Sequence, residues 1–127
     1  MPDLSLSRSE KLKSKKMISR IFDQGASSFK YPLRLKYMIL PTDHVEEAGV
    51  KVAFSVPKRR IAKAVHRNLI KRRMKEAYRL NRKELTLKEE AKHNMLLVFI
   101  YQANEILEYT NIEKSVVKLM KIINKGK

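Results

Sequence analysis

The chain of 127 residues contains no cysteine, only three glycines and only four prolines. Without cysteine it can form no disulfide and has no thiol nucleophile, which fits a reducing compartment. Few glycines and prolines, together with an apolar share of 43%, argue against a disordered chain. Three glycines also provide no glycine-rich loop of the kind that cradles nucleotide phosphates. These totals favour a folded domain that is not a disulfide-stabilised scaffold.

Long hydrophobic runs are also missing. The longest apolar stretch, MLLVFIY at 95–101, has seven residues, whereas a membrane-spanning helix needs about 20. The N-terminal MPDLSLSRSEKLKSKK has no apolar core of signal-peptide length. We therefore expect a soluble, cytoplasmic protein. At this length we also expect a single domain over 1–127, with a loose basic arm at 1–8.

Acidic residues are scarce as well. Thirteen aspartates and glutamates stand against 29 lysines and arginines, which gives a net charge of +16 and a pI of about 10.2. Such an excess destabilises a compact domain by self-repulsion, but it attracts polyanions. Nucleic acid is therefore the expected partner. A merely soluble basic protein and an anionic membrane surface are the alternatives.

Hydrophobic periodicity places the strands. The segments 31–40 (YPLRLKYMIL) and 50–56 (VKVAFSV) alternate apolar and polar residues, which is typical of strands with one buried face. The short polar segment 41–49 between them predicts a hairpin. The segment 94–102 (NMLLVFIYQ) is almost wholly apolar, which predicts a central strand buried on both faces. The order is thus helix, two or three strands, long helix, strand, helix, an α+β fold with one small sheet.

Three helices are expected. Ser14 can cap a first helix that ends at Gly25, and a long helix is predicted from about Ile61 to about Lys83. A capping box at 110–113 (TNIE) starts the last helix. The apolar side of the first helix consists of Met17, Ile18, Ile21 and Phe22. The apolar side of the last consists of Ile112, Val116, Leu119, Met120 and Ile123.

The long helix has two chemically different sides. Opposite the apolar residues Ile70, Met74 and Ala77, with Leu69 and Leu80 at the border, lies an arc of about 100° that is rich in cations. Solvated helix faces usually mix charges, because like charges one turn apart repel. We interpret the arc as a phosphate-binding face, since arginine forks match phosphate oxygens; an ordinary basic surface is the alternative. The arc contains Asn68, Lys71, Arg72, Lys75, Arg79 and Arg82.

The sequence contains no clear catalytic constellation. The histidines His44, His66 and His93 lie far apart, and none has metal-ligand spacing. The acidic pairs at 46–47 and 89–90 are typical of solvated charge. One alternative is a nuclease that acts alone through a pair formed by His66 and His93. We otherwise predict no catalytic residue and no metal ligand in the protein.

The segment 64–81 (AVHRNLIKRRMKEAYRLN) resembles the signature of the bacterial ribonuclease P protein component, which runs Arg-Asn-Arg, then Lys-Arg and a further basic residue. The matching positions are Arg67, Asn68, Lys71, Arg72, Lys75 and Glu76. Two more segments match the family: FSVPKRR with Lys58 and Arg59, and LKSKKMISRIFDQG with Phe22 and Gly25. The three segments occur in the family's order, and the resemblance covers about residues 8–105.

Two positions depart from the family pattern. Leu69 stands where the signature has its second arginine, so one cation contact is lost, and Arg73 is the neighbouring candidate to replace it. Ile18 stands where the family often has an aromatic residue, which removes one expected stacking contact to substrate.

The resemblance implies the order α-β-β-β-α-β-α, with a left-handed crossover around the long helix. It implies the protein subunit of the endonuclease that removes the 5′ leader from precursor tRNA, whose RNA subunit performs catalysis and holds Mg²⁺. The partners are then that RNA and precursor tRNA, with neither DNA nor a membrane expected. Residues expected to bind the catalytic RNA are Lys58, Arg59, Arg67, Asn68, Lys71, Arg72, Lys75 and Arg79.

The resemblance also implies a cleft for the single-stranded leader between the first helix and the outer sheet face. Its expected residues are Phe22, Arg34, Lys36, Tyr37, Lys51 and Ser55. Tyr37 is included as the stacking residue that a strand register shifted by one would expose. One alternative is that a helix covers this sheet face. Another is a ribosomal-type or chaperone-like RNA-binding protein with no role in cleavage.

Overall fold

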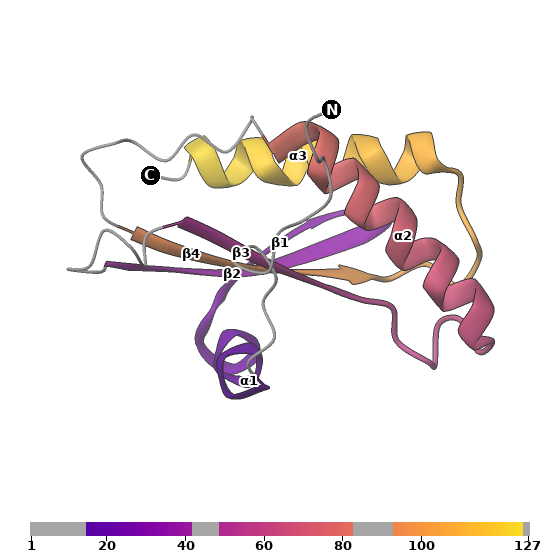
Figure 1. The fold of residues 1–127 in the computed structure, drawn as a ribbon, viewed down its shortest axis with the longest axis horizontal. Coiled ribbons are helices and arrows are strands. Elements are labelled where there is room, and N and C mark those ends of the chain that lie inside the picture. Colours follow the sequence, from indigo (N-terminus) through magenta and orange to yellow (C-terminus); the bar gives the residue numbers. More distant parts are fainter. Residues whose placement is uncertain (1–14, 42–48, 83–92, 126–127) are drawn as a thin grey trace, which may run out of the picture.

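The computed structural model describes residues 15–41, 49–82 and 93–125 (Figure 1). The expected order α-β-β-β-α-β-α is confirmed, and the first strand is one that the sequence pattern did not locate. The basic arm predicted at 1–8, the cap at Ser14 and most of the loop at 41–49 lie outside the described residues. The elements are α1 (Lys15–Gln24), β1 (Ala26–Lys30), β2 (Leu33–Pro41), β3 (Gly49–Ser55), α2 (Ala64–Asn81), β4 (His93–Tyr101) and α3 (Tyr109–Lys125).

The four strands form one mixed sheet in the order β1-β2-β4-β3. β2 pairs antiparallel with β1 and β4, whereas β3 pairs parallel with β4. The hairpin predicted between β2 and β3 is therefore wrong, because β4 lies between them. Residues 95–101 are all buried, and a strand that is apolar on both faces is stabilised most at the centre of a sheet. The left-handed crossover from β3 through α2 to β4 stays a prediction.

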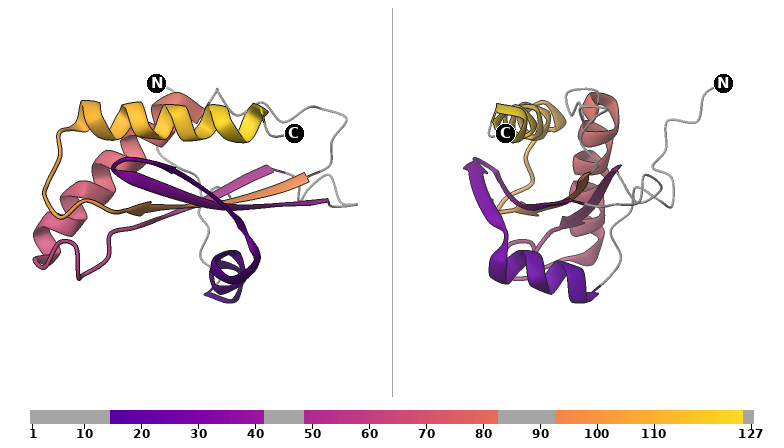
Figure 2. Two further views of the ribbon diagram at one scale, coloured as in Figure 1. Left: turned by 180° about the vertical axis from the view of Figure 1, so that it is seen from behind. Right: turned by 90° about the vertical axis from the view of Figure 1, so that its left-hand side faces the viewer.

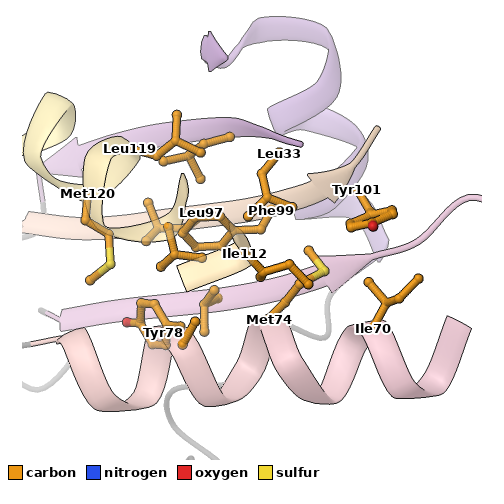
Figure 3. Packing of buried hydrophobic residues seen from close by; sticks show 14 of the residues in the cluster. Leu33, Ile70, Met74, Tyr78, Leu97, Phe99, Tyr101, Ile112, Leu119 and Met120 are labelled. Atoms are coloured by element: carbon orange, nitrogen blue, oxygen red, sulfur yellow. The ribbon is translucent and has the colours of Figure 1, made fainter. Parts of the chain in front are cut away.

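The larger hydrophobic core lies between the sheet and the pair α2 and α3 (Figures 1 and 3). All five apolar residues predicted for the last helix are buried in it, as are Leu33 and Leu35 of β2. Tyr101, the last residue of β4, is buried in this core. Its hydroxyl donates to the Glu105 carbonyl at 2.6 Å and accepts from Leu107 N–H at 3.1 Å. These bonds hold the segment between β4 and α3 against the sheet.

A smaller core lies on the opposite face, where α1 packs against the sheet (Figure 2). Ile21 is fully buried against Leu96, Val98 and Ile100 of β4. Burying one such side chain stabilises the fold by about 1.5–3 kcal/mol. Phe22, predicted on the apolar side of this helix, is instead 41% exposed.

The helix ends differ in detail from those predicted. Ile61 lies before α2, in a turn where its N–H donates to the Pro57 carbonyl at 3.2 Å, and its side chain is buried. The capping box at 110–113 is wrong, because the first turn of α3 closes on the Glu108 carbonyl. The Glu113 carboxylate accepts instead from Asn81 of α2 and from the hydroxyl of Tyr109, both at 3.1 Å. None of the described helices is long and apolar enough to cross a membrane.

Candidate nucleic-acid interface

The apolar side of α2 attaches this helix to the rest of the molecule. Ile70, Met74, Ala77 and Tyr78 are all buried, which confirms the predicted apolar side and adds Tyr78 to it. The Tyr78 ring meets Phe54 of β3 edge-on, with ring centroids 6.1 Å apart. The orientation of α2 about its own axis is therefore set by packing, and its opposite side must point away from the core.

The opposite side carries the predicted cations. Asn68, Lys71, Arg72 and Lys75 are exposed, and with half-buried Arg79 they form what we call the α2 cationic face. The Arg79 guanidinium forms an ion pair with the Glu76 carboxylate, so part of its charge is neutralised within the helix.

Arg67, the first arginine of the signature, turns toward the protein. One terminal nitrogen donates to the carbonyls of Ile61 and Ala62, at 3.0 and 2.6 Å. Arg60 likewise donates to the side chain of Asn104 at 3.3 Å. These bonds tie down the segment 57–63, which joins β3 to α2. The expected contact of Arg67 with RNA stays a prediction, but the structure gives this residue a structural role.

The exposed side chains of Lys58 and Arg59 lie on the same segment. They lie in the segment that joins the end of β3 to the start of α2 (Figure 1). The hydrogen bonds of the Arg60 and Arg67 side chains hold the backbone of this segment. They therefore restrict the directions open to Lys58 and Arg59. The predicted catalytic-RNA residues thus occupy one end of the molecule and the outer side of one helix.

The position of Leu69 is not taken over by a nearby cation. Leu69 is half-buried at the border of the helix. Arg73, the candidate substitute, donates to the Leu107 carbonyl at 2.7 Å, so its guanidinium reaches toward the segment before α3. The signature position that has an arginine in the family is therefore apolar here, and Arg73 serves the tertiary structure.

The sheet face under α1 is arranged in cross-strand rows. The strand register aligns Arg34 on β2 with Ile100 on β4 and Ser55 on β3. The next row aligns Lys36 with Val98 and Ala53. The cluster around α1 includes Val98 and Ala53 of the second row and also Ile100 of the first, so the alternative that a helix covers this face is correct along the central strand β4. Exposed Lys51 lies further along β3, at its outer edge.

On this side of the sheet, a cationic side chain lies over each of two exposed aromatic rings. The Arg34 guanidinium lies 5.1 Å from the centroid of the Phe29 ring, and the Lys36 ammonium lies 5.3 Å from that of Phe22. Arg34 also donates to the Ser27 hydroxyl at 3.0 Å. Sequence reasoning missed Phe29, because β1 is too short and too polar to show a strand period.

Tyr37 is not part of this face. Its ring packs against the larger core, on the same side of β2 as Leu35. The register shifted by one that would have exposed Tyr37 beside Arg34 is therefore wrong, because it would move every apolar residue of β2 out of the core. The exposed ring beside Arg34 is that of Phe29, not that of Tyr37.

The described residues do not assemble an acid–base site. His66 lies in the first turn of α2, near the end of β3, whereas His93 starts β4 at the other end of the sheet (Figure 1). The pair proposed for a lone nuclease is therefore wrong. Within 15–41, 49–82 and 93–125, no three His, Cys, Asp or Glu side chains gather as metal ligands.

Two tyrosines have raised pKa values for structural reasons. Burial raises the pKa of Tyr101 above its usual value of 10.0. Burial and, second, the hydrogen bond to Glu113 raise the pKa of Tyr109 to about 12. Both groups stay protonated at neutral pH, so neither acts as a general base.

Comparison with known proteins agrees with this arrangement. The family model described as Ribonuclease P matches residues 6–124. A "Ribonuclease P protein component" of Porphyromonas gingivalis is 32% identical over 92% of this chain and 85% of its own. That of Chlorobaculum tepidum is 36% identical over 78% of this chain and 68% of its own.

Solved structures share the fold. The RNase P protein of Staphylococcus aureus aligns with a TM-score of 0.66 at 19% identity, over 90% of this chain and 94% of its own. The RNase P protein of Thermotoga maritima aligns with a TM-score of 0.66 at 17% identity, over 89% of this chain and 96% of its own. The family match over almost the whole chain, on this α-β-β-β-α-β-α fold, shows that the chain belongs to the ribonuclease P protein family.

Proposed function

We propose that this chain is the protein subunit of a ribonuclease P, which removes the 5′ leader from precursor tRNA. In this proposal the α2 cationic face, with Lys58 and Arg59, binds the catalytic RNA. The α1 side of the sheet holds the single-stranded leader. The observation that carries the proposal is the exposure of Asn68, Lys71, Arg72 and Lys75 on a helix whose other side is buried.

The α2 cationic face suits a structured polyanion. Its cations recur at helical spacing on a rigid rod about 27 Å long, and each neutralised phosphate releases counterions. Arginine forks add two-point contacts to phosphate oxygens. The negative potential of an RNA subunit would therefore orient the protein as well as attract it.

The leader-binding part of the proposal rests on the sheet. We call Phe22, Phe29, Arg34, Lys36 and Ser55 the leader surface. Exposed aromatic rings beside cations bind unpaired nucleotides through stacking and phosphate contact, without base preference. The row that holds Phe29, Arg34 and Ser55 leads to the end of β3, where Lys58 and Arg59 begin. One strand of RNA can thus pass from the α2 end of the molecule across the sheet to β1.

The chemistry of cleavage is assigned to the RNA subunit. Mg²⁺ held there would supply the metal-ion chemistry of phosphodiester hydrolysis. The described protein residues form no group of three His, Cys, Asp or Glu side chains that could hold a metal ion. The protein's own contribution is electrostatic, because its cations reduce repulsion between phosphates of substrate and RNA subunit. We place the complex in the cytoplasm, with neither DNA nor membrane as a partner.

Reconstitution tests the proposal. The purified chain is added to a bacterial ribonuclease P RNA at low magnesium, and precursor tRNA cleavage is followed. We expect strong stimulation by the chain and no cleavage by the chain alone. Binding to the RNA without stimulation would instead support an RNA-binding protein of ribosomal type. Cleavage without added RNA would contradict an RNA-catalysed mechanism.

A further inference from the structure

A hollow of about 280 Å³ lies where the turn between β1 and β2 meets α3. This volume is near the lower end for ligand pockets, roughly 300 Å³. It lies on the α3 side of the sheet, opposite the face on which α1 packs. Among its lining residues are Lys30, Tyr31, Pro32, Leu107, Asn111 and Lys114.

Hydrogen bonds hold the walls of the hollow in place. The Ser115 hydroxyl, 1% exposed, donates to the Lys30 carbonyl at 2.5 Å. Gln102 N–H donates to the Pro32 carbonyl at 2.8 Å. The bonds of the Tyr101 hydroxyl fix the position of Leu107. The turn, α3 and the segment before α3 are thus joined, so a ligand would bind without ordering loose chain.

The lining has the chemistry of a nucleotide site. The Tyr31 ring is 55% exposed and offers a stacking surface. Exposed Lys30 and Lys114 offer positive charge, and the Asn111 amide can both donate and accept. None of the described lining residues carries a carboxylate. A ring, two cations and one amide match the base, phosphates and base edge of one unpaired nucleotide.

A line of lysines extends from the hollow along α3. Lys114, Lys118 and Lys121 are exposed and lie on one side of the helix, opposite Val116 and Met120 in the larger core. Their spacing covers about 10 Å of helix. We call these three residues the α3 lysine track; its geometry suits consecutive phosphates of an extended strand.

The hollow and the leader surface share the β1–β2 hairpin, at the edge of the sheet, but lie on opposite faces of it. Phe29 pairs with Arg34 on the α1 side, whereas Lys30 pairs with buried Leu33 and lines the hollow with Tyr31 on the α3 side. A strand that crosses the sheet from Ser55 toward Phe29 reaches this edge, and it enters the hollow by passing around the turn.

We propose that the hollow around Tyr31 and the α3 lysine track bind the upstream part of the single-stranded leader, beyond the nucleotides on the sheet. This inference rests on the proposed function. It adds a second site on a helix that the family resemblance did not involve. It also predicts that the protein discriminates precursors by leader length.

A leader-length series tests it in the reconstituted holoenzyme. Precursor tRNAs with leaders shortened one nucleotide at a time are bound by wild type, Tyr31→Ala and Tyr31→Phe. With long leaders, Tyr31→Ala should weaken precursor binding about five-fold or more, because stacking on the ring is lost. Tyr31→Phe keeps the ring and should behave as wild type. The difference should vanish once the leader is too short to reach the turn.

Charge variants give a second readout. Lys114→Gln with Lys118→Gln should lower the salt slope for long-leader precursors by about 1.4, the value for two phosphates of a single strand. Lys15→Gln with Lys16→Gln removes the same charge from α1 and should not change the dependence on leader length. Thermal unfolding midpoints show whether each variant is folded.

The outcomes separate this inference from the proposed function. Equal losses at all leader lengths, or losses in binding to the catalytic RNA alone, would assign the hollow to that RNA and overturn the leader site. Wild-type behaviour of Tyr31→Ala and of the lysine pair at every length would also overturn it. If the wild-type chain binds neither RNA, the proposed function itself fails.

Discussion

The arginines of α2 differ in what their guanidinium groups do, although the sequence pattern treats them alike. Arg72 is exposed on the α2 cationic face. Arg67 and Arg73 donate instead to backbone carbonyls on neighbouring segments. The Arg72 side chain is thus exposed to solvent, whereas Arg67 and Arg73 stabilise the attachment of α2 to its neighbouring segments.

Arg72→Ala should therefore weaken binding of the catalytic RNA roughly ten-fold, the equivalent of one charge-assisted contact. It should also lower the salt slope by about 1. The matched control is Arg20→Ala, which removes another exposed arginine, on α1. Filter binding with labelled RNA at several salt concentrations measures both. Equal losses for the two variants would contradict the assignment of the α2 cationic face.

For Arg67 the informative change is Arg67→Lys, which keeps the charge. The ammonium of a lysine lies one bond nearer the backbone than the Arg67 terminal nitrogen that donates to the Ile61 and Ala62 carbonyls, so it does not reach both in the same geometry. We expect a loss of about 1 kcal/mol in the free energy of unfolding, whereas Arg72→Lys should change it by less than about 0.5 kcal/mol. Urea denaturation followed by circular dichroism measures both. An unchanged midpoint for Arg67→Lys would show that its bonds do not hold the segment.

At the scale of elements, the junction of α1 with the sheet depends on close backbone approach. Gly25 ends α1, and its N–H donates to the Ile21 carbonyl at 2.8 Å. A Cβ at this position would lie 2.5 Å from that carbonyl oxygen and 2.9 Å from the Tyr37 carbonyl oxygen. The predicted helix-ending glycine is thus confirmed in position. The reason is the lack of space between α1 and β2.

Gly25→Ala should destabilise the protein by roughly 1–3 kcal/mol, because two backbone segments must separate to admit the methyl group. Ser19→Ala, an exposed change in the same helix, is the control and should stay within about 0.5 kcal/mol. Chemical denaturation gives both values. A Gly25→Ala variant as stable as wild type would mean that α1 can shift freely on the sheet.

At the scale of the whole molecule, charge is distributed over separate surfaces. The chain has a net charge of +16, and cations of its described part lie on the α2 cationic face, at the end of β3, on the leader surface and along α3. These surfaces lie on different sides of the sheet, so the positive charge is not confined to one helix. We infer that the charge excess serves two RNAs, a structured one at α2 and an unpaired one at the sheet and α3.

Binding of the catalytic RNA should consequently depend steeply on salt. Four to five phosphates at about 0.7–0.9 each predict a slope of about −2.8 to −4.5 in a plot of log affinity against log salt concentration. Titration of fluorescently labelled RNA at a series of potassium chloride concentrations measures it. A flat plot would contradict an electrostatic interface.

The features that the sequence predicted correctly depend on residues close together in the chain. The apolar sides of α2 and α3 and the burial of β4 were read correctly, because they are periodic patterns within one segment. The pairing partner of β2 was not, since it depends on competition between β3 and β4 for the centre of the sheet. For the same reason the sequence did not indicate Phe29 and allowed Tyr37 to be assigned to the wrong face of the sheet. Which residues of a strand face the core depends on its pairing with neighbouring strands.

The sequence by itself determined the order of the elements other than β1, the two-sided α2 and the excess of positive charge, and the signature in α2 indicated the family. Local periodicity and composition are enough for these. Only the tertiary structure decided that Arg67 and Arg73 bond to the protein, and that α1 covers the middle of one sheet face. It also decided that the turn at Tyr31 meets α3 around a hollow. Each of these depends on contacts between residues distant in the chain, which form only when the sheet has assembled.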